Sequence, residues 1–307
     1  MTAFTVLDGG MGRELKRIGA PFSQPLWSAQ ALIEAPHFVE QAHQNFVAAG
    51  AEIIIVNSYA CVPFHLGEEG YQRDGVRLAQ LAAKIAHTVG CSNDAVAVAG
   101  SLAPPFGSYR PDLFQARRAQ QIYQQLYDAQ VSYIDLWIAE TISSIAELEV
   151  VQSVLQQSNK PCHYAFTLQD ELDSGKVCLR SGEPLSEALD SISLDKAAGI
   201  MFNCSVPEVM EAAVLEVKQW QEHSGVSLEG SVLEIGVYAN NFAPIESDHQ
   251  ANGTLQQMRT LTPEDYLALA QRWHKAGATI IGGCCGISPE HIKALAHWSQ
   301  QLNSKPS

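Results

Sequence analysis

Residues 278–285 read ATIIGGCC, an apolar run that passes into two glycines and two adjacent cysteines. It is the last of eight short β-rich runs spread along the chain. The other runs are FTVLDGG (4–10), AEIIIVNS (51–58), AVAVAGSL (95–102), SYIDLWIAE (132–140), CHYAFTL (162–168), GIMFNCS (199–205) and EIGVYANN (234–241). Most of them lack polar alternation, which is typical of parallel strands buried on both faces.

Segments with helical spacing lie between these runs. They cover residues 36–50, 74–90, 146–157, 207–220, 263–277 and 289–302; several begin at proline and three end at glycine, as helices prefer. Repeated alternation of strand and helix predicts an α/β fold, namely a (β/α)8 TIM barrel, rather than a doubly wound sheet with an added domain. No linker interrupts the pattern, so we expect one domain over residues 1–307.

Three connections are longer than the others. They follow the third, fifth and seventh predicted strands and cover residues 101–118, 169–184 and 240–262. All three leave the carboxyl ends of strands, the face on which barrel enzymes build their sites, so we expect these loops to shape a pocket.

Composition narrows the class of protein. With 46% hydrophobic and 17% charged residues, the chain fits a globular protein. Its net charge of −14 argues against nucleic acids and anionic membranes as partners. No apolar run approaches the roughly 20 residues that span a bilayer. The seven cysteines, an odd number, and the absence of a basic leader favour a reducing compartment, and we expect a cytoplasmic protein.

Three cysteines stand at strand ends. Cys204 closes the sixth strand, while Cys284 and Cys285 close the eighth, so a barrel brings the three sulfurs to one rim. A disulfide between the adjacent pair would be strained, because adjacent Cα atoms lie about 3.8 Å apart and ordinary disulfides need about 4.4 to 6.8 Å. Ordinary buried cysteines are an alternative.

The same three cysteines suit a zinc site. Both sulfurs of the pair reach one ion only if the chain turns between them, which Gly282, Gly283 and Gly286 permit. Thiolates are good ligands for Zn²⁺, and three protein ligands leave the fourth position open, as in catalytic sites. We therefore expect Cys204, Cys284 and Cys285 to be zinc ligands and catalytic.

Several stretches carry a family resemblance: residues 7–19 (LDGGMGRELKRIG), 25–36 (PLWSAQALIEAP), 57–60 (NSYA), 99–107 (AGSLAPPFG), 138–149 (IAETISSIAELE), 166–170 (FTLQD), 202–208 (FNCSVPE) and 282–295 (GGCCGISPEHIKAL). With these motifs the chain resembles the zinc-dependent homocysteine S-methyltransferases, and among them the single-domain enzymes that use S-methylmethionine or S-adenosylmethionine. The resemblance implies that homocysteine binds as a thiolate at the open zinc position. Its sulfur then takes a methyl group from the sulfonium donor, which gives methionine.

The resemblance also suggests which residues hold homocysteine. Asp8, Gly9 and Gly10 end the first strand, where family members contact the amino acid part of this substrate; Asp-Gly is also a common tight turn. Glu140 ends the fourth strand and suits the substrate ammonium. It is not needed to cap the next helix, because Ser144 and Glu147 have the spacing of a capping box.

The sequence says less about which residues bind the methyl donor. Trp27 and Tyr59 are the aromatic candidates for a sulfonium, although aromatic residues also pack in loops. Asn203 is expected either to orient a ligand or to satisfy backbone groups. Asn240 ends the seventh strand, where Ala239 replaces a proline common in relatives, so this side of the pocket departs from the family.

Other assignments compete with this one. A zinc hydrolase would carry water at the open position, but three thiolates leave zinc a weak Lewis acid and no general base is evident nearby. A zinc-binding or sensing barrel without turnover is the alternative outside enzymes. His65 and His163 are expected to be structural or solvent-facing, because no histidine has the HExxH spacing.

Overall fold

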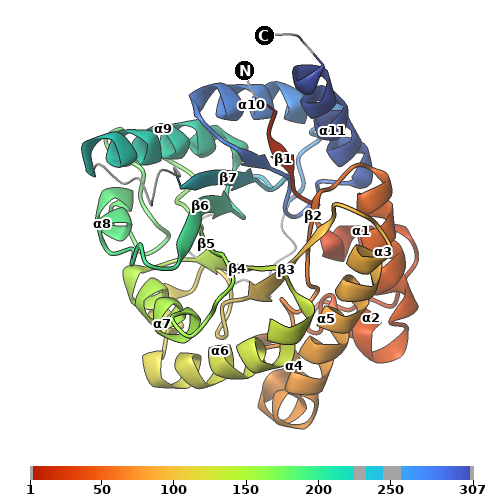
Figure 1. The fold of residues 1–307 in the computed structure, drawn as a ribbon. Helices are drawn as coiled ribbons and strands as arrows, with labels where there is room; N and C mark the ends of the chain where they lie inside the picture. Colours follow the sequence, from red (N-terminus) through yellow and green to blue (C-terminus); the bar gives the residue numbers. More distant parts are fainter. Residues whose placement is uncertain (1–2, 225–232, 245–256, 305–307) are drawn as a thin grey trace.

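The computed structural model describes residues 3–224, 233–244 and 257–304, and these form a nearly closed barrel of parallel strands inside a ring of helices (Figure 1). The strands are β1 (Thr5–Val6), β2 (Ile53–Ile55), β3 (Ala97–Leu102), β4 (Leu136–Ile142), β5 (Cys162–Phe166), β6 (Ala197–Asn203), β7 (Glu234–Tyr238) and β8 (Ile280–Ile281). Each falls within or overlaps a predicted run. The (β/α)8 barrel predicted from the sequence is confirmed.

The barrel closes between its first two strands. The sheet order is β1-β8-β7-β6-β5-β4-β3-β2, so β1 and β2 stand at the two ends of the ladder. A single parallel bridge joins Leu7 to Ile53. On either side of it, Asp8 N donates to Ile53 O at 3.0 Å and Glu52 N donates to Val6 O at 2.7 Å. The last contacts of the barrel therefore form beside Asp8.

Eleven α-helices surround the strands within the described residues. They are α1 (Met11–Arg17), α2 (Ala29–Glu34), α3 (His37–Ala48), α4 (Pro63–Gly70), α5 (Val76–Cys91), α6 (Ala116–Gln130), α7 (Ile145–Leu155), α8 (Leu185–Asp190), α9 (Pro207–Ser224), α10 (Pro263–Ala276) and α11 (Pro289–Asn303). The six predicted helical segments all correspond to helices. None of the helices is both long and apolar enough to cross a membrane.

Helix α6 was not predicted, and its first residues fall in the stretch expected to be loop. Its sequence, ARRAQQIYQQLYDAQ, is dominated by polar residues, which hides the apolar stripe. Ala119, Ile122, Tyr123 and Leu126 nevertheless recur at helical spacing and are buried. The other unpredicted helices, α1, α2, α4 and α8, have six to eight residues each, too short for a clear period.

Two apolar layers hold the strands in place. One fills the barrel and includes Leu7, Ile138, Met201 and Tyr238, and the other lies between the strands and the helices. All residues of β4 are buried, as are all residues of β5. Burial on both faces explains why the strands lack polar alternation.

The predicted long loops lie at the carboxyl ends of their strands. The loop after β3 and the loop after β5 meet, because the Arg180 guanidinium stacks on the Tyr109 ring at 4.9 Å from its centroid. Within the loop after β7, residues 245–256 lie outside the described residues.

Helix α7 begins at the predicted cap. The Ser144 hydroxyl accepts a hydrogen bond from Glu147 N at 3.2 Å. The Glu147 carboxylate accepts from Ser143 N at 2.7 Å and from the Ser143 hydroxyl at 2.9 Å, so the returning half of the box reaches one residue further back than Ser144. Burial raises the pKa of Glu147 to about 7 despite these hydrogen bonds.

This shifted pKa predicts a pH dependence of stability. Between about 4.5 and about 7, Glu147 holds more protons in the folded than in the unfolded chain, so the free energy of unfolding falls as pH rises through this interval. We expect Glu147→Gln to remove its share of that fall, on the order of 3 kcal/mol. Urea denaturation of both proteins at a series of pH values measures it, and parallel curves would contradict it.

Candidate functional site

A cavity of about 140 Å³ opens at the carboxyl ends of the strands. Nine residues predicted for the site line it: Asp8, Gly9, Gly10, Trp27, Tyr59, Glu140, Cys204, Cys284 and Cys285. They come from strands and loops that are far apart in the sequence and that the barrel places around one rim.

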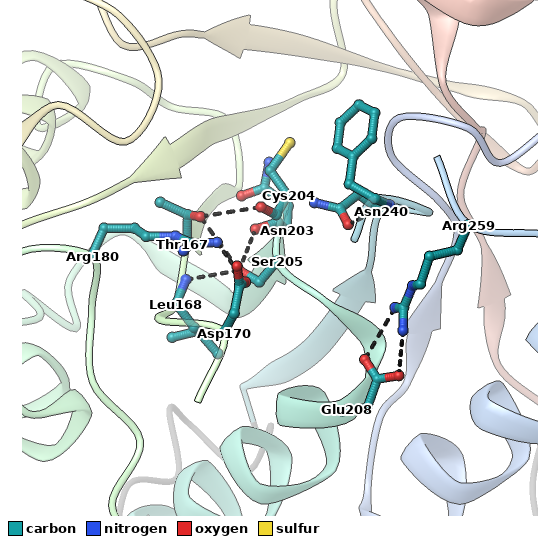
Figure 2. Close-up of polar contacts among 11 residues, drawn as sticks. Thr167, Leu168, Asp170, Arg180, Asn203, Cys204, Ser205, Glu208, Asn240 and Arg259 are labelled. Atoms are coloured by element: carbon teal, nitrogen blue, oxygen red, sulfur yellow. Dashed lines mark hydrogen bonds and ion pairs between the residues drawn. The ribbon is translucent and has the colours of Figure 1, made fainter. Parts of the chain in front are cut away.

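Cys204 follows β6 in a left-handed backbone conformation, with φ +51°. This conformation is costly for a residue with a side chain and persists only where its surroundings enforce it. Ser205 provides that support: its hydroxyl donates to Asn203 O at 3.1 Å and accepts from Leu168 N at 2.8 Å. Figure 2 shows Ser205 bridging to the segment after β5, with Thr167 Oγ1 directed at Cys204 O, 3.4 Å away.

Glu140 is followed by a second left-handed residue, Thr141, with φ +60°. The fully buried amide of Asn203 holds it from the side, because Asn203 Oδ1 accepts from Thr141 N at 3.0 Å and Asn203 Nδ2 donates to Thr141 Oγ1 at 2.9 Å. Of the two roles considered for Asn203, the satisfaction of backbone groups is therefore the one the geometry provides.

Asn240 is also engaged within the protein. Its Oδ1 accepts from Phe242 N at 3.1 Å, and its backbone N–H donates to Ser205 O at 3.1 Å. Neither Asn203 nor Asn240 is among the residues that line the cavity, and contact of either with a substrate stays a prediction. Both instead fix the backbone next to residues that do.

The chain turns at Cys284 and Cys285, as a shared site requires. Cys284 N donates to Ala239 O at 2.9 Å, and Cys285 O accepts from Asn241 N at 2.8 Å. Of the neighbouring glycines, Gly286 has a positive φ of +86°. Gly10 contributes from the opposite segment, because a Cβ there would lie only 2.6 Å from Cys284 O.

The three thiols interact with one another. Hydrogen bonds from Cys204 and Cys284 lower the pKa of Cys285, and the positive charge of Arg13 lowers it further. All seven cysteines are free, so the adjacent pair forms no disulfide. Among the described residues, no three His, Cys, Asp or Glu side chains are already arranged as a metal site. The three thiols that line the cavity are nevertheless the side chains in it that could act as sulfur ligands of a metal ion.

Two buried carboxyls face the same cavity. Asp8 Oδ2 accepts from Ile55 N at 2.9 Å, while Glu140 accepts from the Ser101 hydroxyl at 2.5 Å and from the Tyr238 hydroxyl at 3.4 Å. Burial raises the pKa of Asp8 well above its usual range and that of Glu140 to about 7. Neither forms an ion pair with a described residue, so a cationic ligand would favour their charged forms.

The predicted aromatic residues both line the cavity. The Tyr59 hydroxyl lies 2.5 Å from Ser108 Oγ and donates to Thr141 Oγ1 at 3.3 Å. Trp27 has a positive φ of +51° and packs against Phe22, with ring centroids 5.3 Å apart.

The sequence alone did not reveal three other residues of the cavity, Arg13, His65 and Tyr109. Tyr109 lies in the loop after β3, whose length was the one available signal. His65 is buried rather than solvent-facing, and burial lowers its pKa to about 4, so its ring is neutral near pH 7. His163 has a structural position, paired with Glu234 at 2.7 Å at the opposite end of the barrel.

Comparison with known proteins agrees with this geometry. The family described as homocysteine S-methyltransferase matches residues 5–299, nearly the whole chain. The chain belongs to the homocysteine S-methyltransferase family. It is therefore a methyltransferase, and small molecules are its substrates.

Relatives within this family share modest identity over most of their length. Homocysteine S-methyltransferase 4 of Zea mays is 27% identical, with 95% of this chain and 88% of the relative covered. Homocysteine S-methyltransferase YbgG of Bacillus subtilis is also 27% identical, with coverages of 97% and 95%. The solved metallated form of homocysteine methyltransferase MmuM from Escherichia coli superposes with a TM-score of 0.76 at 25% identity, covering 97% of this chain and 96% of that one.

The contact between Asn203 and Thr141 predicts the effect of a substitution in this methyltransferase. Asn203→Ala removes two buried hydrogen bonds and leaves the Thr141 N–H without its acceptor, so we expect the free energy of unfolding to fall by about 1 to 3 kcal/mol. Urea denaturation measures it. The exposed Asn303→Ala should change stability by less than about 0.5 kcal/mol, and an equal effect of both substitutions would refute the proposed support.

Proposed function

We propose that this enzyme transfers a methyl group from a sulfonium donor, S-methylmethionine or S-adenosylmethionine, to the sulfur of homocysteine. The observation that carries the proposal is the meeting, around one cavity, of three thiols and two buried carboxyls that form no ion pair with a described residue. The thiols suit a thiophilic metal ion, and the carboxyls suit the positive charges of an amino acid and a sulfonium.

We assign Cys204, Cys284 and Cys285 as the ligands of a zinc ion. The donor set fits, because Zn²⁺ binds thiolates well and three protein ligands leave room for a substrate. When bound, zinc would act as a Lewis acid that keeps a coordinated thiol deprotonated near neutral pH. The existence of a metallated form of the Escherichia coli neighbour supports the binding of a metal by this enzyme. The thiols must stay reduced, which fits the expected cytoplasmic location.

Asp8 and Glu140 are assigned to the ammonium of homocysteine. Both carboxyls are anchored, Asp8 by Ile55 N and Glu140 by Ser101 and Tyr238, so they form a fixed acceptor for a cation. Gly10 N already donates to Ile287 O at 2.9 Å, which leaves the Gly9 N–H of this turn for the substrate carboxylate.

The transfer itself is an in-line displacement. A lone pair of the homocysteine thiolate forms the new S–CH₃ bond as the bond between the methyl carbon and the donor sulfonium breaks. The bonding electrons stay on the donor sulfur, which becomes a neutral thioether and leaves without an added proton. Trp27 and Tyr59 offer aromatic faces in the same cavity as the two carboxyls, which favours binding of the sulfonium.

Turnover tests the proposed function directly. We expect purified protein supplied with zinc, homocysteine and S-methylmethionine or S-adenosylmethionine to form methionine, measured by chromatography. Bound zinc without methionine from any sulfonium donor would reject the proposal and favour a zinc-binding barrel without turnover. Hydrolysis of a substrate by a zinc-bound water would favour the hydrolase.

Loss of one ligand should remove both metal and activity. We expect Cys204→Ser to lower zinc affinity and kcat/KM by about 100-fold or more, because the effect should exceed the 10- to 100-fold known for residues outside the metal ligands. Zinc content by atomic emission and the rate of methionine formation measure it. The exposed Cys91→Ser is the matched control and should keep both. A Cys204→Ser protein with full zinc and full activity would eliminate the ligand assignment.

Replacement of the central carboxyl should act mainly on homocysteine. Glu140→Gln keeps the shape but loses the charge that pairs with the ammonium, so we expect KM for homocysteine to rise roughly 10- to 100-fold. Steady-state kinetics with homocysteine varied at saturating donor measures it. An unchanged KM would place the ammonium elsewhere.

A further inference from the structure

Arg13 lines the cavity and forms no ion pair with any residue that the structure describes. Eight of the ten arginines in the chain form ion pairs with neighbouring carboxylates. Arg13 and Arg117 form none within the described residues, and of these two only Arg13 lines the cavity. It is the third residue of α1, is half-buried, and lies close enough to Cys285 for its charge to act on that thiol.

The carboxyls of the cavity do not serve as partners for Arg13. Asp8 is held by Ile55 N, and Glu140 is held by Ser101 and Tyr238, so both acceptors are anchored at their own positions. The cavity therefore presents two carboxyls, Asp8 and Glu140, that a bound cation would ionise, and a separate cationic group at Arg13. This arrangement of charge complements a zwitterion, whose ammonium and carboxylate require opposite partners.

A guanidinium is well suited to the carboxylate end. Its planar fork can donate two parallel hydrogen bonds to one carboxylate, which a backbone amide cannot do. Of the two amides in the turn at Gly9 and Gly10, only the Gly9 N–H remains to share the carboxylate with Arg13, because Gly10 N is already bonded to Ile287 O. A half-buried guanidinium that has no ion-pair partner among residues 3–224, 233–244 and 257–304 thus lies in the same cavity as the thiols, where a ligand can reach it.

We propose that Arg13 binds the carboxylate of an amino acid substrate and thereby selects substrates that carry one. This inference rests on the proposed function, since both homocysteine and S-methylmethionine have an α-carboxylate. Homocysteine and S-methylmethionine carry the same carboxylate group, and the experiment distinguishes which of the two compounds binds to Arg13 through it.

Paired substrates with and without the carboxylate test the proposal. The thiol pair is homocysteine and 3-aminopropane-1-thiol, and the donor pair is S-methylmethionine and (3-aminopropyl)dimethylsulfonium. We expect Arg13→Gln to lower kcat/KM for the carboxylate-bearing member of one pair by about 10- to 100-fold, and to change the decarboxylated member by less than about twofold. Where the decarboxylated compound turns over too slowly, its inhibition constant replaces kcat/KM. The pair that responds identifies the source of the carboxylate.

Further variants separate binding from structure. Arg13→Lys retains the charge but not the fork and should restore part of the preference for the carboxylate. The exposed Arg117→Gln is the matched control and should leave all four substrates unaffected. If Arg13→Gln does not fold, Arg13→Met preserves the aliphatic stem and takes its place.

The outcomes distinguish this proposal from the proposed function. A wild-type protein that forms no methionine rejects the function before Arg13 is tested. With an active wild type, an equal loss for both members of each pair, an unchanged preference, or a loss of zinc from Arg13→Gln would overturn the role of Arg13. A selective loss for the carboxylate-bearing member supports it.

Discussion

Two hydrogen bonds between the Asn203 amide and Thr141 tie the end of β6 to the end of β4. Through them, the backbone that carries Cys204 and the backbone that carries Glu140 are set relative to each other across the intervening strand β5. Both strand ends leave the barrel through a left-handed residue, Thr141 or Cys204. Each such residue costs on the order of 1 to 3 kcal/mol, so it persists because neighbouring groups determine the conformation. The positions of a thiol and a carboxyl in the cavity thus depend on one buried amide.

The charges of the cavity are arranged at some cost to the stability of the free protein. Asp8 and Glu140 are buried without an ion pair among the described residues, and burial raises the pKa of each. A positively charged ligand reverses this effect, because a nearby cation favours the ionised carboxylate. Binding of an amino acid and a sulfonium would therefore shift these two carboxyls toward their charged forms.

The rim is assembled by contacts between loops rather than by the strands alone. Arg180 pairs with Asp170 at 2.7 Å and stacks on Tyr109, which has a positive φ of +65° and lines the cavity. On the other side, Arg259 pairs with Glu208 at 2.6 Å and so joins the segment after β7 to the start of α9 (Figure 2). The barrel provides a rigid frame, and these loop contacts shape the opening above it.

The sequence by itself determined the eight strands, the barrel and the convergence of Cys204, Cys284 and Cys285, because burial on both faces and the β/α alternation are local patterns that fix which residues end each strand. It also placed Asp8, Glu140, Trp27 and Tyr59 near the cavity. Tertiary structure alone decided the rest. Asn203 and Asn240 form hydrogen bonds that support the backbone. Arg13, His65 and Tyr109 line the cavity. The position of each of these side chains depends on contacts between segments that are distant in the chain. Such contacts leave no periodic signal in the sequence, since they depend on side-chain directions that are set only when the barrel closes.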